Sequence, residues 1–153
     1  MATTSHVPAF VRLGNILTRT MLRAGIKVAG PKKVPMYLLT VRGRKSGQPR
    51  TTPIVVIEQD GKCYFLAPFG VVDWVRNLRA AGAATLTRGR RTEAIQTSEL
   101  LTDAASLVLK RGLADGSIPS FLVKYFGITP ESSPQELEEA AGGHPVFLLR
   151  SRA

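Results

Sequence analysis

The spacing of hydrophobic residues along the chain predicts a domain of strands with flanking helices. From Val34 to Leu100 the apolar runs are short and are bounded by glycine, proline and charged residues, which is typical of strands. Asp60-Gly61 is a two-residue hairpin signal between two such runs. We therefore expect a mainly β, α+β fold with about six antiparallel strands. The predicted strands are Val34–Gly43, Thr51–Gln59, Lys62–Ala67, Ala84–Arg88, Arg91–Leu100 and His144–Arg150.

Helices are predicted between and after these strands. Ser133-Pro134-Gln135-Glu136 is a capping box with proline at the first helical position, and the helix that it begins ends at Gly142-Gly143. The other predicted segments are a helix from Asp73, its expected cap, to about Ala81, a helix from Thr102 or Asp103 to Gly116, and the short apolar segment Ile118–Phe126.

The N-terminal segment, from about Pro8 to Val28, has the pattern of a basic amphipathic helix. Its apolar residues cluster on one side, with Arg12, Arg19, Arg23 and Lys27 nearly opposite. The apolar stripe would pack on the domain, or it would rest on an anionic membrane with the basic residues near the lipid headgroups. The pattern leaves both interpretations open.

Length and cysteine content indicate an ordinary globular domain. The chain has 153 residues, of which 44% are hydrophobic, enough for one domain with a sizeable core. It has one cysteine, Cys63, and no cluster with the spacing of metal ligands, which excludes an internal disulfide and a structural zinc or iron–sulfur site. No metal is expected. We divide the chain into an N-terminal helix with its linker, residues 1–31, and a single domain, residues 32–153.

Positive charge is concentrated in the first two-thirds of the chain. The formal net charge is +10, and no acidic residue precedes Glu58. Up to Glu99 there are 16 basic and 5 acidic residues, whereas the rest of the chain has 5 basic and 6 acidic ones. Such a distribution attracts anions, so the candidate partners are nucleic acid, an anionic membrane and a phosphorylated cofactor. Nucleic acid ranks last, because no aromatic residue that could stack on a base lies between Arg42 and Arg50.

The segment Gly43–Pro53 combines several anion-binding features in a turn between two predicted strands. Its side chains offer guanidinium forks, an ammonium group and a hydroxyl, and its glycines would let backbone N–H groups face an anion. A solvated basic hairpin tip is the alternative interpretation. The residues concerned are Arg44, Lys45, Ser46 and Arg50, with the glycines Gly43 and Gly47.

Pro53 and the end of the neighbouring strand indicate a place for a flat ring. Because proline cannot donate to a strand ladder, Pro53 belongs at a strand start, a bulge or an edge, where it and Thr52 would suit a heteroaromatic ring. Ala67-Pro68-Phe69-Gly70 bends the backbone at the same end of the hairpin. Trp74 and Asn77 share one face of the helix that follows. Packing of Trp74 in the core is the alternative.

Taken together, these motifs resemble the deazaflavin-dependent nitroreductase family, actinobacterial oxidoreductases that use the 8-hydroxy-5-deazaflavin coenzyme F420. The resemblance rests on the series G-R-K-S-G-Q-P-R-T-T-P, A-P-F-G, W-V-R-N-L-R-A-A-G and H-P-V-F-L-L. It spans about Met36 to Leu101 and recurs at the last strand. It implies a split β-barrel related to the barrels that bind flavin mononucleotide (FMN), which makes FMN the alternative cofactor.

The resemblance also implies a role for each matching residue. The phosphate and the acidic tail of F420 would contact Arg44, Lys45, Ser46, Gly47 and Arg50. The deazaflavin ring would border Thr52, Pro53 and Ile54 and the backbone of Ala67, Pro68, Phe69 and Gly70. The expected cofactor set is completed by Trp74, Arg76 and Asn77.

The sequence departs from the family pattern in three places. Val75 replaces the usual tyrosine, and the loop from Ala67 to Trp74 is shorter and lacks a second glycine. The C-terminal region offers only Tyr125 as a candidate proton donor, so activation of nitro drugs is not part of the expectation.

We expect an enzyme that transfers a hydride from reduced F420 to an electron-poor, lipophilic acceptor such as an enone, a quinone or a nitroaromatic. The alternatives are a non-catalytic carrier of F420 or of a fatty-acyl ligand, and an FMN-dependent reductase. The expected location is the cytoplasm, with the inner face of the cell membrane as a second one, and a homodimer is left open. For His144 we expect a structural hydrogen bond.

Overall fold

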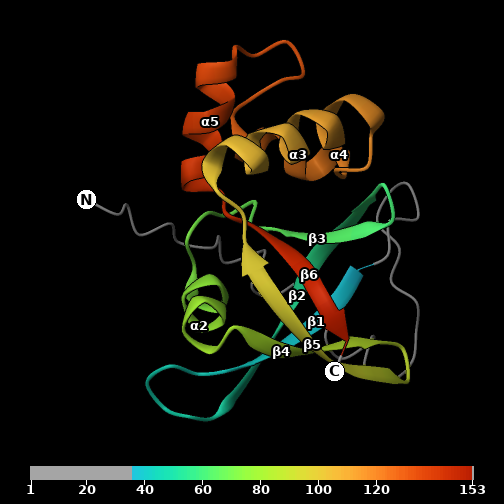
Figure 1. Cartoon of the computed structure of the whole chain (residues 1–153), viewed down its shortest axis with the longest axis vertical. Coiled ribbons are helices and arrows are strands. Elements are labelled where there is room, and N and C mark those ends of the chain that lie inside the picture. The colour runs from blue at the N-terminus through green and yellow to red at the C-terminus, as the bar shows by residue number, and fades with distance from the viewer. Residues whose placement is uncertain (1–35, 153) are drawn as a thin grey trace.

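The six predicted strands form and close into one antiparallel barrel, in the order β1-β2-β3-β6-β5-β4 (Figure 1). The computed structural model describes residues 36–152. The helix expected over residues 8–28 and the boundary between residues 31 and 32 lie outside this range. The strands are β1 (Met36–Arg42), β2 (Pro49–Gln59), β3 (Lys62–Leu66), β4 (Ala83–Arg88), β5 (Arg91–Glu99) and β6 (Val146–Arg152). The expected split β-barrel fold is confirmed.

Helices follow the third and fifth strands. The capping box predicted at Ser133 is present, since its Oγ accepts from Glu136 N at 3.1 Å and Glu136 Oε1 accepts from Ser133 N at 3.2 Å. Among the described residues, none of the helices has the length and apolarity needed to span a membrane. The helices are α2 (Asp73–Ala81), α3 (Thr102–Asp115), α4 (Ser120–Phe126) and α5 (Pro134–Gly143).

The hairpin predicted at Asp60-Gly61 joins β2 and β3. Both turn residues have positive φ, 52° and 77°, which the tightest antiparallel hairpins require. Arg111 of α3 binds the Asp60 carboxylate through both guanidinium nitrogens, at 2.7 and 3.1 Å. This hydrogen bonding, with the positive charge of Arg111, lowers the pKa of Asp60 from its ordinary value.

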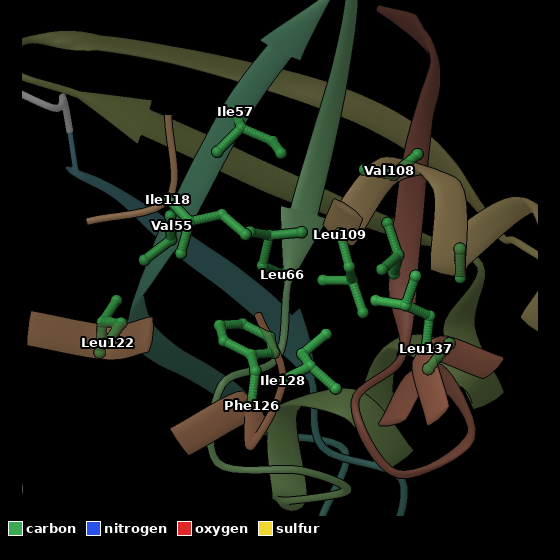
Figure 2. Packing of buried hydrophobic residues seen from close by; sticks show 13 residues of the cluster. Val55, Ile57, Leu66, Val108, Leu109, Ile118, Leu122, Phe126, Ile128 and Leu137 are labelled. Atoms are coloured by element: carbon green, nitrogen blue, oxygen red, sulfur yellow. The ribbon is translucent and has the colours of Figure 1, made fainter. Parts of the chain in front are cut away.

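Strand β2 is apolar on both faces because it separates two hydrophobic clusters. Ile54 and Val56 point into the barrel, whereas Val55 and Ile57 point outward and pack under α3, α4 and α5. Figure 2 shows Val55 and Ile57 among residues of these helices, such as Leu109. The period of two along a strand therefore accounts for four consecutive apolar residues. The interior cluster comprises Leu39, Val41, Ile54, Val56, Phe65, Ala67, Val75, Leu78, Leu86, Ile95 and Phe147.

Helix α2 lies apart from the other three helices, beside the barrel (Figure 1). Its residues Val75 and Leu78 are buried in the interior cluster. The prediction that Asp73 caps this helix is wrong, because Val72 occupies the N-cap position and Asp73 is the first helical residue. Its carboxylate is turned toward arginine side chains instead.

Candidate cofactor site

The turn Gly43–Gln48 between β1 and β2 is held by hydrogen bonds of its own. Gly43 N donates to Gln48 O at 2.8 Å, and Gly47 N donates to Gly43 O at 2.9 Å. Gln48 N donates to Ser46 Oγ at 3.2 Å. A Cβ at Gly43 would lie 2.9 Å from Ser46 Oγ and 3.1 Å from Gln48 O, and Gly47 has φ +71°, so both positions favour glycine. We call this segment the basic turn.

Four backbone N–H groups of the basic turn, those of Gly43, Arg44, Gly47 and Gln48, donate within the protein and do not face an anion. Those of Gly43 and Gly47 donate to carbonyl groups of the turn, and that of Arg44 donates to Asn77 Oδ1. The two glycine N–H groups are therefore not available to an anion, whereas the basic side chains are. Those of Lys45 and Arg50 are exposed.

Asn77 of α2 fixes the position of Arg44. This asparagine is only 4% exposed, and its Oδ1 accepts from Arg44 N at 3.1 Å and from Arg44 Nη1 at 2.8 Å. The sequence predicts a cofactor contact for Asn77; the structure gives its side-chain oxygen the task of orienting the arginine.

Trp74 lies one helical turn before Asn77 and belongs largely to the core. Its ring is half-buried, packs with the interior cluster and is tilted against Phe147 at 5.9 Å between centroids. This is the core packing that the sequence left as the alternative.

Arg44 and a second arginine converge on one carboxylate oxygen. Asp73 Oδ1 lies 3.6 Å from Arg44 Nη2 and 3.6 Å from Arg76 Nη1. One guanidinium comes from the basic turn and the other from α2. Because these two cations already hold a carboxylate, their arrangement fits an anionic group.

The ladder between β2 and β3 ends a few residues beyond the basic turn. Its last pair is Val55 with Leu66. Extending the same register by two residues would place Pro53 opposite Pro68, and neither residue has an N–H group to donate. The two strands therefore part at this point, and we call the place where they part the ladder opening.

Pro53 lies within β2 rather than at its start, which corrects one of its predicted positions. The strand begins at Pro49, and Pro53 pairs with Leu38 of β1. Since β3 joins only from Val55 onward, Pro53 occupies an edge, as the sequence allowed. Proline suits this edge because it has no N–H group to donate to a further strand.

Alternation along β2 connects the basic turn with the ladder opening. Arg50, Thr52 and Ile54 share the face that Val41 and Leu39 present on β1. Arg50 is exposed, Thr52 is half-buried and Ile54 is 3% exposed within the interior cluster. Because the side chain of Ile54 is buried, a ligand could contact only the backbone of this residue.

The chain leaves β3 through a braced turn, Ala67–Gly70. Gly70 N donates to Ala67 O at 3.1 Å, and Gly70 has φ +81°, which favours glycine. His144 Nδ1 lies 3.0 Å from the same Ala67 oxygen. Because a carbonyl oxygen only accepts, Nδ1 carries the proton, and the expected structural hydrogen bond of His144 is confirmed. Burial lowers the pKa of His144, which favours the neutral ring.

Tyr125 of α4 contacts the Ala67–Gly70 turn. Its ring is half-buried and makes an edge contact with Phe69 at 4.8 Å between centroids and an interplanar angle of 71°. The structure therefore brings the one candidate proton donor of the sequence analysis close to the Ala67–Gly70 turn.

The described residues of the basic turn and α2 fit an anionic group of a ligand. Glycines keep the basic turn narrow, and two arginines lie 3.6 Å from a carboxylate. At the ladder opening Pro53 and Phe69 are half-buried, whereas Ala67, Pro68 and Gly70 are buried. Sequence reasoning did not note that Pro53 and Pro68 each lie two residues beyond the last pair of the β2–β3 ladder. A signal for it was present, since both prolines lie equally far from the Asp60-Gly61 hairpin.

Solved structures similar to this chain share its fold. An F420-H2 dependent reductase (FDR-A) is 23% identical with a TM-score of 0.52, over 76% of this chain and 94% of that one. A protein described as a domain-swapped dimer is 22% identical with a TM-score of 0.53, over 92% and 97%. A NimC/NimA family protein from Clostridium acetobutylicum is 15% identical with a TM-score of 0.51, over 80% and 78%.

The family of the chain follows from its sequence. The comparison with curated proteins gives no match. Residues 16–117 match the family described as F420H(2)-dependent quinone reductase, which covers both the basic turn and α2. The chain therefore belongs to the F420H(2)-dependent quinone reductase family and is an F420-dependent oxidoreductase.

Proposed function

We propose that the protein transfers a hydride from reduced F420 to an electron-poor, lipophilic acceptor such as a quinone, an enone or a nitroaromatic. Family membership supports the reductase over the non-catalytic carrier, and F420 over FMN. When bound, reduced F420 supplies the hydride, and the protein supplies position and shielding from water. The observation that carries the proposal is that one strand, β2, leads from the basic turn directly to the ladder opening.

The anionic tail of F420 is assigned to the basic turn. Lys45 and Arg50 are exposed and unite a mobile ammonium group with a guanidinium fork. Arg44 is held by Asn77, so it needs little reordering when it binds an anion. Ser46 Oγ accepts from Gln48 N, which leaves its hydroxyl hydrogen to donate. Gly47 contributes through the shape of the turn.

The ring is assigned to the ladder opening. Thr52, Pro53 and the backbone of Ile54 would border it along β2, and the backbone of the Ala67–Gly70 turn would face it from the end of β3. Trp74 receives a supporting role, because it packs against Phe147.

Tyr125 is the proton donor that we propose for the acceptor. A quinone that takes up a hydride also takes up a proton, and Tyr125 contacts Phe69 of the turn assigned to the ring. Phe121, in the same helix α4, is 44% exposed and offers an apolar surface for a lipophilic acceptor.

Titration of the purified protein with F420 and with FMN tests the proposal. We expect tighter binding of F420, and the double variant Lys45→Gln/Arg50→Gln should weaken it about tenfold or more, because two charged hydrogen-bond donors are lost. Lys62→Gln/Lys110→Gln removes the same charge at two other exposed positions and should leave the affinity nearly unchanged. Equal affinity in both double variants would move the tail away from the basic turn.

A further inference from the structure

Asp73 lies near two arginines, where an anionic group of a ligand is expected. Its side chain is far more exposed than those of the arginines. Its side chain is 83% exposed, whereas those of Arg44 and Arg76 are 26% and 29% exposed. The two cations are therefore partly built into the protein, and the carboxylate between them is loosely placed. Both contacts are 3.6 Å long, beyond the usual length of a charged hydrogen bond.

The position of Arg44 does not depend on Asp73. Asn77 Oδ1 holds both the backbone N–H and the Nη1 of Arg44, so the guanidinium keeps its place when Asp73 moves away. Arg76 lies three residues after Asp73 on α2, where i, i+3 side chains meet. Removal of the carboxylate would leave two neighbouring positive charges without the anion that screens their repulsion.

We propose that Asp73 is a displaceable internal counterion of the cofactor site. It holds the Arg44–Arg76 pair while no ligand is bound, and an anionic group of the F420 tail takes its position when the cofactor binds. The inference rests on the proposed function, since it assumes that the tail reaches the basic turn.

This exchange makes the site selective for strongly anionic ligands. A ligand group must interact with the two arginines better than the Asp73 carboxylate does, because that interaction is lost on binding. A phosphodiester or a chain of carboxylates satisfies this requirement, since it brings several charges at once. A neutral ring without such a tail gains nothing from the two arginines.

The test is the affinity for F420, measured by titration, of Asp73→Asn against the unmodified protein. Asparagine removes the competing charge, so we expect F420 to bind about two- to fivefold more tightly, which is the scale of an exposed ion pair. Asp60→Asn is the matched control. Asp60 is also an exposed carboxylate paired with an arginine, and asparagine tolerates its positive φ. It lies at the other end of the eleven-residue strand β2, roughly 35–40 Å of extended chain from the basic turn. This control should leave the affinity unchanged.

A double-mutant cycle separates direct competition from a general effect of charge. In an Arg76→Gln background the gain from Asp73→Asn should shrink, because one of the two contacts is already lost. The same gain with and without Arg76, or no gain from Asp73→Asn, overturns the inference while leaving the proposed function intact. Failure of the unmodified protein to bind F420 overturns the proposed function itself.

Discussion

Asn77 shows how a single buried amide connects a helix with a binding turn. Its oxygen accepts from a backbone N–H and from a guanidinium of the same residue, Arg44. A buried acceptor that is satisfied twice by one partner fixes both the main chain and the side chain of that partner. Helix propensity and charge patterns do not reveal such a contact, because its partners lie 33 residues apart. The sequence could identify Asn77 as important but could not assign its role.

Substitution of Tyr125 tests its proposed role as proton donor. If its hydroxyl donates the proton, Tyr125→Phe should lower quinone-dependent oxidation of F420H2 about 100-fold or more, while the affinity for F420 stays unchanged. The measurement is the rate at which oxidised F420 absorbance appears with menadione as acceptor. Tyr64→Phe, a half-buried tyrosine of β3, is the control and should retain full turnover. Full turnover in Tyr125→Phe as well would leave solvent as the proton source.

At the scale of helices, strands and turns, the features predicted correctly from the sequence are those that depend on residues close together in the chain. The Asp60-Gly61 hairpin and the Ser133 capping box form as expected, since each depends on neighbouring residues. The start of β2 lies two residues earlier than predicted, at Pro49, because pairing with β1 extends it into the basic turn. Asp73 was misassigned as a cap because the helix begins one residue earlier than predicted from it: Val72 is the N-cap, and Asp73 lies near Arg44 and Arg76.

Helix α3 is packed so closely against Ile118 and β2 that its one glycine, Gly112, has no room for a side chain. A Cβ at Gly112 would lie 2.8 Å from Ile118 Cγ1 and 3.3 Å from Ile57 Cδ1. Gly112→Ala should therefore lower the free energy of unfolding by about 1–3 kcal/mol, as overpacked cores do. The measurement is urea denaturation of both proteins.

Gly142→Ala in α5 is the matched control for this substitution. Nothing lies within 4 Å of a Cβ at Gly142, so alanine should be neutral or should stabilise the helix by about 0.5–1 kcal/mol. Equal effects of the two substitutions would mean that helix propensity, and not the contact with Ile118, decides the outcome.

At the scale of the whole molecule, the barrel and the helix layer meet at His144. Its ring contacts Phe126 of α4 at 5.1 Å between centroids, and its Nδ1 bonds to Ala67 O at the end of β3. The order in which six strands close depends on such long-range contacts. The sequence predicted the strands from their spacing and the barrel from a family resemblance; spacing alone cannot tell which face of β2 lies inside.

The buried His144 predicts how stability depends on pH. Its pKa in the folded protein is below the ordinary value of 6.5, mainly because burial disfavours the charged ring. The unfolded chain therefore binds a proton more readily, and the free energy of unfolding should fall as the pH drops below about 6.5. Urea denaturation at about pH 7.5 and 5.5 measures this fall, which should be smaller in His144→Gln. The same fall in both proteins would assign it to other groups.

The two prolines beyond the end of the β2–β3 ladder have a consequence for solubility as well. An unprotected strand edge recruits strands of other chains, which leads to aggregation. Where β2 and β3 separate, Pro53 and Pro68 withhold two of the donors that an incoming strand would need. The free edge of β2 beyond the ladder is therefore a poor template for a further strand, which protects the protein against edge-to-edge association.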